Sequence, residues 1–176
     1  MGSLDNKACL KILHQEKVPI HIIRHCVKVS SVSCKIAYNL LRTGYKLDID
    51  LIRAGALLHD VAKMKALRHG GDHAEMGARL LEAMGYDKIG EVIRQHVFLR
   101  PALENLKGLN EELVVNYADK RVMHTRIVSL EERFSDLVER YGKDRRAKER
   151  INELYLQTRL MEQRIFEKLD IGPEDI

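Results

Sequence analysis

Apolar residues recur at intervals of three and four along almost the whole of this 176-residue chain. This spacing places them on one face of an α-helix, whereas the alternating pattern of β-strands and the Asn-Gly turns of hairpins are absent from the sequence. With 45% hydrophobic residues, the chain can bury one substantial core. We therefore predict an all-α fold, a helical bundle formed by a single domain over residues 1–176.

Capping residues divide the pattern into helices, because Asp, Asn and Ser side chains accept hydrogen bonds from the free N–H groups of a first turn. Glycine and proline mark where helices end. Predicted starts are Asp5, Pro19, Asp48 or Asp50, Asp72 with Glu75 as a capping box, Asp87, Asn110, Ser129 and Asp144, and predicted stops are Gly44, Gly85, Gly142 and Gly172-Pro173. The helix after Asp87 is expected to carry His96, and segments 64–72 and 97–110 are expected to be loops.

The last predicted helix, over about residues 144–169, carries an apolar stripe. Its members are Ile151, Leu154, Tyr155, Thr158, Met161, Ile165 and Leu169. We expect this stripe to pack on the bundle, so that residues from about 129 to 170 form a C-terminal helical extension. A homodimer formed through the stripe is the alternative.

Composition excludes several classes of protein. No run of eighteen apolar residues and no secretory signal are visible, so we expect a cytoplasmic protein without a membrane partner. The cysteines Cys9, Cys26 and Cys34 are odd in number and lack CxxC spacing, which argues against disulfides and against cysteine as a metal ligand. The net charge of +4 arises from interspersed acids and bases and does not indicate a nucleic-acid partner.

The pair His59-Asp60 closes an apolar run over residues 51–58, and Lys63 follows three residues later. An imidazole beside a carboxylate at the end of a buried run is costly unless both groups have partners. Both are good metal ligands, so the pair predicts a cation site.

Four further ligand-type residues lie far apart along the chain. In order with the pair they give His25, His59-Asp60, His73, His96 and Asp119, which resembles the HD-domain superfamily of metal-dependent phosphohydrolases. Residues 59–63 are similar to the HDxGK signature, with Ala62 where a glycine is more usual. Residues 73–78 resemble the helix that follows the signature, 117–120 its closing aspartate helix, and Arg24-His25 its opening histidine. We expect the metal-site core to span about residues 19–124.

The resemblance implies a ligand set. It assigns His25, His59, Asp60 and Asp119 to one ion, and His73 and His96 to a second ion that Asp60 would bridge. Some members have two consecutive histidines where this chain has His96-Val97, so the second position lacks one ligand. Without a second ion, His73 and His96 would bind a phosphate or move protons. Imidazole and carboxylate ligands suit Mn²⁺, Fe²⁺, Co²⁺, Ni²⁺ or Zn²⁺.

The chemistry expected of such a site is attack on phosphorus by water. A bound dication lowers the pKa of water towards roughly 7, and cationic side chains stabilise charge on the phosphoryl oxygens. Asp60 and Lys63 are the predicted catalytic residues. Predicted substrate contacts are Lys63, Lys120, Arg121 and Arg24, with Arg100 as a weaker candidate, and His124 follows Asp119 closely enough to reach a substrate.

The expected function is therefore hydrolysis of a phosphomonoester or phosphodiester, in a nucleotide or a related small phosphorylated metabolite. A non-catalytic metal or nucleotide sensor that uses the same pocket is the alternative. A third hypothesis is an all-α interaction module whose histidines only stabilise the fold, since a fold by itself does not determine function.

Overall fold

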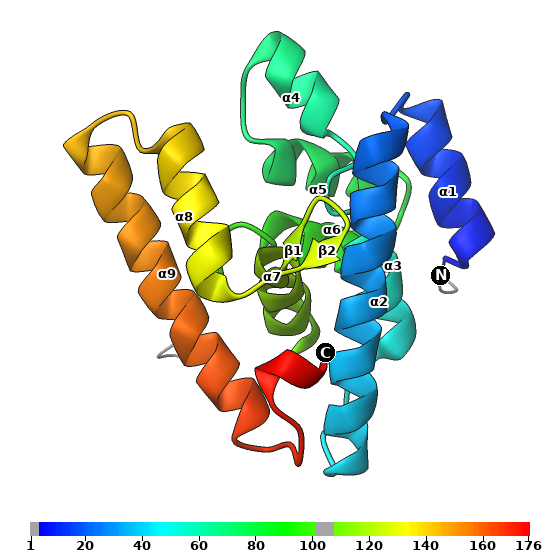
Figure 1. Cartoon of the computed structure of the whole chain (residues 1–176). Coiled ribbons are helices and arrows are strands. Elements are labelled where there is room, and N and C mark those ends of the chain that lie inside the picture. Colours follow the sequence, from blue (N-terminus) through cyan, green and yellow to red (C-terminus); the bar gives the residue numbers. More distant parts are fainter. Residues whose placement is uncertain (1–3, 101–107) are drawn as a thin grey trace.

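The computed structural model describes residues 4–100 and 108–176 and confirms the all-α prediction. The helices are α1 (Asn6–Gln15), α2 (Ile20–Arg42), α3 (Ile49–Leu58), α4 (Lys63–His69), α5 (His73–Ala83), α6 (Asp87–Arg94), α7 (Glu111–Arg121), α8 (Leu130–Tyr141) and α9 (Arg145–Phe166), with a short 3₁₀ turn η2 (Pro173–Asp175). Figure 1 shows α8 and α9 side by side, on the opposite side of the bundle from α1. None of the described helices is both long and apolar enough to cross a lipid bilayer.

Most of the predicted caps are confirmed. Asp5, Asp48, Asp72, Asn110, Ser129 and Asp144 each accept a hydrogen bond from a backbone N–H group in the first turn of their helix. Gly44 and Gly85 follow α2 and α5 with φ angles of 93° and 82°, a left-handed conformation that only glycine adopts without strain. The sequence therefore contains the start and stop signals for most of the bundle.

Three predictions about local structure are wrong. Residues 63–69 form α4 rather than a loop, because Lys63, Met64, Lys65, Ala66 and Leu67 are all good helix formers that continue directly from the His59-Asp60 turn. Tyr86, not Asp87, is the N-cap of α6, and that helix ends at Arg94, so His96 lies in the turn that follows it. Of the predicted loop at 97–110, residues 101–107 lie outside the described residues, and its other residues are neither helix nor strand.

A small antiparallel hairpin follows α7 and was not predicted. Strand β1 (Val122–Met123) pairs with β2 (Arg126–Ile127), with Val122 opposite Ile127. Strands of two residues are too short to show an alternating pattern in the sequence. At its tip His124 has a φ of 58°, unusual for a residue with a side chain.

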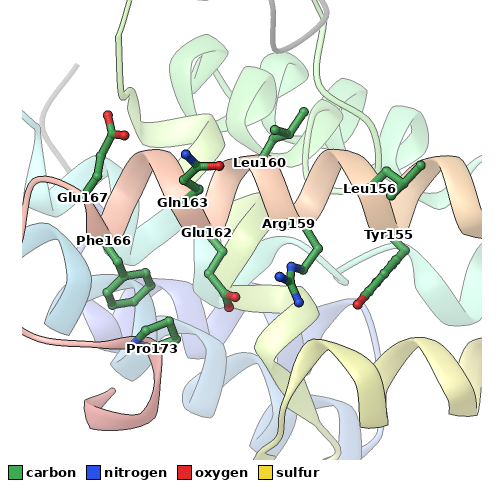
Figure 2. A pocket seen from close by; sticks show the side chains of 9 residues that line it. All are labelled: Tyr155, Leu156, Arg159, Leu160, Glu162, Gln163, Phe166, Glu167 and Pro173. Carbon is green, nitrogen blue, oxygen red and sulfur yellow. The ribbon is translucent and has the colours of Figure 1, made fainter.

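The core lies around α2, α3 and α7, and α9 closes one side of it. Thr158, Met161 and Ile165 of the predicted stripe are buried, which confirms that the stripe packs on the bundle. Another part of α9 borders a cleft of about 860 Å³. Figure 2 shows Leu156 and Leu160, both about half exposed, pointing to one side of α9, with Arg159 and Glu162 on the other.

Helices α3 and α6 approach each other closely at Gly55. A Cβ atom at this position would lie 2.4 Å from Cγ1 and 3.0 Å from Cβ of Val92, a fully buried residue of α6. Only glycine allows this approach, and it brings together the two helices that end next to His59 and His96.

We expect Gly55→Ala to destabilise the protein by about 1–3 kcal/mol, because overpacking a close-packed core forces side chains and backbone to shift. The cost of overpacking outweighs the stabilisation of about 1 kcal/mol that alanine gains over glycine in helix propensity. Thermal unfolding followed by circular dichroism measures the difference. In a Val92→Ala background the same glycine substitution should be neutral or stabilising, and an equal loss in both backgrounds would contradict the contact.

Candidate metal centre

Three separate parts of the chain bring the four residues of the predicted first site together. His25 comes from α2, His59-Asp60 from the junction of α3 and α4, and Asp119 from α7. Asp119 Oδ1 lies 3.1 Å from His25 Nε2 and 3.5 Å from His59 Nε2, and Asp60 Oδ2 lies 3.6 Å from His59 Nε2. Ligand atoms bonded at 2.0–2.2 Å to one ion stand about 3.0–3.5 Å apart. These separations fit a shared cation.

The second predicted pair lies on the other side of Asp60. Asp60 Oδ1 is 3.4 Å from His73 Nε2 and 3.9 Å from His96 Nε2, and the two Nε2 atoms are 3.1 Å apart. Asp60 therefore directs one oxygen towards each group of histidines. The three residues are close enough together to hold an ion of their own.

Backbone carbonyls set the orientation of three imidazoles. Nδ1–H of His59 donates to Ala56 O at 2.8 Å, that of His96 to Ile93 O at 2.6 Å, and that of His25 to His124 O at 3.0 Å. A carbonyl can only accept, so Nδ1 carries a proton, and in its neutral form each ring presents the Nε2 lone pair to the cluster. The left-handed turn at His124 brings its carbonyl to His25.

The environment of the buried His59 Nε2 atom indicates whether this site suits a cation. His59 is 1% exposed, and its Nε2 atom has no hydrogen-bond partner among the described residues. Such an atom is costly to bury, and a cation facing the lone pair would remove that cost. The residues present therefore fit a metal ion.

The protonation states of His73, His96 and Asp60 agree with this fit. At His59 burial alone would lower the pKa, but the neighbouring acidic groups raise it well above its ordinary value, so a cation would take the place of a proton there. Burial lowers the pKa of His96 to about 3 and also lowers the pKa of His73, so both rings are neutral near pH 7. Burial alone would raise the pKa of Asp60, but the charges of His59 and Lys63 hold it well below its ordinary value. Neutral imidazoles and an ionised carboxylate are the forms that bind metals.

Cys26 also lies next to the cluster, where the sequence did not place any cysteine. Its sulfur lies within 4.8 Å of ligand atoms of both His59 and Asp60, and the residue is fully buried. The lack of CxxC spacing had argued against any cysteine ligand. That spacing describes sites built within one segment, whereas Cys26 reaches this cluster because it follows His25 on α2.

An arginine joins the elements that carry His73 and His96. The Arg94 guanidinium, at the end of α6, donates to Glu75 Oε2 at 2.9 Å and to Glu82 Oε1 at 2.7 Å, both on α5. The Glu75 carboxylate binds Arg79 and Arg94 rather than completing the predicted capping box, of which α5 shows only the Asp72 cap. These ion pairs stabilise the packing that holds His73 and His96 side by side.

Two predicted cationic residues lie at the cluster. Lys63 Nζ donates to Asp60 Oδ2 at 2.7 Å, and its side chain is 42% exposed, so it can also contact a substrate. Lys120 is buried and donates to His96 O at 2.6 Å, and burial lowers its pKa to about 8. Lys120 therefore fixes the turn at His96 and lies beneath the site.

Three predicted arginines do not join the cluster. Arg121 is buried and donates to Val128 O at 2.7 Å and to Tyr117 Oη at 2.6 Å, and it pairs with Glu162 of α9. Its role is to hold α9 on the bundle, so its prediction as a substrate contact is wrong. Arg24 and Arg100 are exposed and do not line the cleft beside the cluster.

That cleft has a volume of about 280 Å³ and opens onto the cluster. His25, Asp60 and Lys63 line one part of it. The rest of its lining is His21, Ile22, Met64, Leu67, Val122, Met123, His124, Arg133, Asp136, Leu137, Arg140 and Tyr141. The residues of α8 were not predicted, because nothing in their spacing indicates that α8 folds back over the histidines.

Residues 22–124, more than half of the chain, match the family model of the HD domain, and the chain belongs to this family. The resemblance to the HD superfamily of metal-dependent phosphohydrolases is thereby confirmed.

An uncharacterized protein of Methanocaldococcus jannaschii is 27% identical over 143 residues, which are 74% of this chain and 83% of that protein. A tRNA (cytidine(56)-2'-O)-methyltransferase of Picrophilus torridus is 31% identical over 73% of this chain and 39% of its own length. The enzyme of the same name from Thermoplasma volcanium is 30% identical over 53% of this chain and 26% of its own length. The chain thus spans well under half of either methyltransferase. No solved structure shows significant similarity to it.

We expect a divalent metal to stabilise the protein through His59. At a free Mn²⁺ concentration of a hundred times Kd the gain is about 2.7 kcal/mol, or roughly 5–10 °C in Tm for a chain of this length. The shift is measured by adding Mn²⁺ to chelator-treated protein. It should be lost in His59→Ala and kept in His14→Ala, which changes an exposed histidine of α1. An equal shift in both variants would contradict the site.

Proposed function

We propose that this chain is a metal-dependent phosphohydrolase that cleaves a phosphomonoester or phosphodiester of a nucleotide-like small metabolite. The convergence of His25, His59, Asp60 and Asp119 at the end of a cleft carries the proposal. Membership of the HD family supports it.

His25, His59, Asp60 and Asp119 would hold a first cation, and Asp60, His73 and His96 a second. Nitrogen and oxygen ligands suit Mn²⁺, Fe²⁺, Co²⁺, Ni²⁺ or Zn²⁺. Such a cation supplies Lewis acidity, which polarises a phosphoryl oxygen and lowers the pKa of water. The residues supply its position: Asp60 lies between the two groups of histidines, and backbone carbonyls keep three of the rings turned inward.

Lys63 would bind the phosphoryl group. Burial alone would lower its pKa, but the Asp60 carboxylate raises the pKa above its ordinary value, so the ammonium stays charged. Asp60 holds the ammonium at the cluster while the rest of the side chain lines the cleft. A fixed positive charge beside the non-bridging oxygens stabilises the charge that develops there during hydrolysis.

The cleft supports a small substrate. Its volume of about 280 Å³ lies near the lower end of ligand pockets, which run from about 300 to 1,000 Å³. Met64, Leu67 and Val122 give it an apolar wall away from the charged residues. This combination favours a phosphate attached to a compact organic group, such as a single nucleoside.

Loss of Asp60 is the first test. Phosphate release is measured over mononucleotides, cyclic nucleotides and, because two relatives are named as tRNA methyltransferases, a tRNA, each with the five candidate metals. We expect turnover of at least one small phosphoester by the wild type and background activity for Asp60→Ala. Full activity of Asp60→Ala would refute the site, and tight binding without turnover would identify a sensor instead.

A second test compares two lysines of the same helix. We expect Lys63→Gln to lower kcat/KM by about tenfold to a hundredfold, since it removes a charge facing the phosphoryl oxygens. Lys65→Gln removes the same charge from an exposed position of α4 and should leave kcat/KM unchanged. Equal effects of the two substitutions would show that Lys63 acts only through the overall charge.

A further inference from the structure

Helix α8 contributes two arginines to the lining of the cleft. Arg133 and Arg140 line the same cleft as His25, Asp60 and Lys63. Both belong to the C-terminal helices, beyond the stretch at 22–124 that matches the HD domain. The family match therefore assigns them no role.

Arg133 has hydrogen-bond donors that the described residues leave available for a bound ligand. Its side chain is 19% exposed, and its buried Nε has no hydrogen-bond partner among the described residues. Its contact with Asp136 is long, 3.4 Å from Nη1 to Oδ2. A guanidinium offers five N–H donors in a planar fork that matches phosphate oxygens.

Asp136 holds the two arginines together. Its Oδ1 accepts from Arg140 Nε at 2.7 Å, and its Oδ2 faces Arg133. Arg140 is 49% exposed, and its Nη2 lies 3.5 Å from Nε2 of His124, the residue whose carbonyl orients His25. Arg133 thus lies in the inner part of the cleft, and Arg140 lies nearer to solvent.

The charges of this wall favour an anion. Lys63, Arg133 and Arg140 are positive, and among the described residues that line the cleft only Asp60 and Asp136 are negative. Asp60 is shared by Lys63 and the histidines, and Asp136 is shared by two arginines, so two carboxylates face three cationic side chains and the cleft keeps an excess of positive charge.

We propose that Arg133, assisted by Arg140, binds the phosphoryl oxygens of the ligand and makes α8 the specificity-determining wall of the site. The inference deepens the proposed function and rests on it for the nature of the ligand. Arg133 donates from Nε and Nη to non-bridging oxygens across the cleft from Lys63. Arg140 contacts the same group or its substituent nearer to solvent.

Binding of inorganic phosphate tests this separately from turnover. Calorimetry is done on protein loaded with Mn²⁺ and freed of excess metal. We expect Arg133→Gln to weaken phosphate binding by about tenfold to a hundredfold, the loss for charge-assisted hydrogen bonds. Arg133→Lys should recover part of the affinity, because it restores the charge without the fork. Arg140→Gln should lower the phosphate affinity by about threefold to tenfold, a smaller effect, because the Arg140 side chain is half exposed.

Arg146→Gln is the matched control, since it removes the same charge from an exposed position of α9. It should bind phosphate as the wild type does, and melting curves and metal content should match in all variants. If Arg133→Gln lowers Tm but binds phosphate within twofold of the wild type, Arg133 is structural and the inference is overturned. Absence of phosphate binding by the wild type overturns it as well.

Kinetics with p-nitrophenyl phosphate and bis(p-nitrophenyl) phosphate separate the two kinds of ester. A larger effect of Arg133→Gln on the monoester assigns the subsite to a terminal phosphate, and a larger effect on the diester assigns it to an internal one. If turnover does not depend on Arg133, the proposed hydrolase activity stands and the proposed phosphate subsite is wrong. If phosphate binding depends on Arg133 but no ester is turned over, the subsite stands and the proposed hydrolase activity is wrong.

Discussion

The burial of the Asp60 carboxylate is the constraint on which the whole site depends. Only 2% of this side chain is exposed, and an isolated buried charge is unstable unless it is paired and hydrogen-bonded. Lys63 and the Nε2 atoms of His59 and His73 lie around its two oxygens. The apolar run of α3 positions this carboxylate at the edge of the core, so the core and the site are specified by the same segment.

The direction of the imidazoles follows from helix geometry. His59 is the C-cap of α3 and His96 lies just after α6, and each donates Nδ1–H to a carbonyl three residues earlier. The last carbonyls of a helix lack some of their intrahelical partners, so a histidine at this point can donate Nδ1–H to one of them and direct Nε2 away from the helix end. His25 lies inside α2, where carbonyls accept from backbone N–H groups of the helix, and its own acceptor is His124 O in the hairpin. The hairpin that the pattern failed to predict is therefore part of the site.

The parts of the fold that were predicted from sequence are those determined by local chemistry. Asp48, Asp72 and Ser129 cap helices because their side chains reach N–H groups within three residues, which is visible in any sequence. The metal-ligand set was predicted because six residues follow one another along the chain in the order of the HD-family pattern. The positions of Cys26, Arg121 and Arg133 were not predictable in this way, since each depends on which distant element packs against it. Arg121 and Asp119 are two residues apart on α7, yet one faces α9 and the other faces the histidines.

The division between the family-matched region and α8 gives a physical basis for specificity. The candidate ligands from α2, the end of α3 and α7 lie beside the buried core, where a substitution would disturb both stability and the site. Helix α8 contributes fewer buried residues, only Leu130 and Phe134, so its cleft-facing side chains can change without loss of the bundle. A site with a fixed reacting centre and a variable wall can accept different phosphate esters in different relatives. In this chain Arg133 and Arg140 make the α8 wall basic. Among the described residues, Lys63 provides the one partly exposed ammonium at the cluster, and it lines the same cleft as the two arginines.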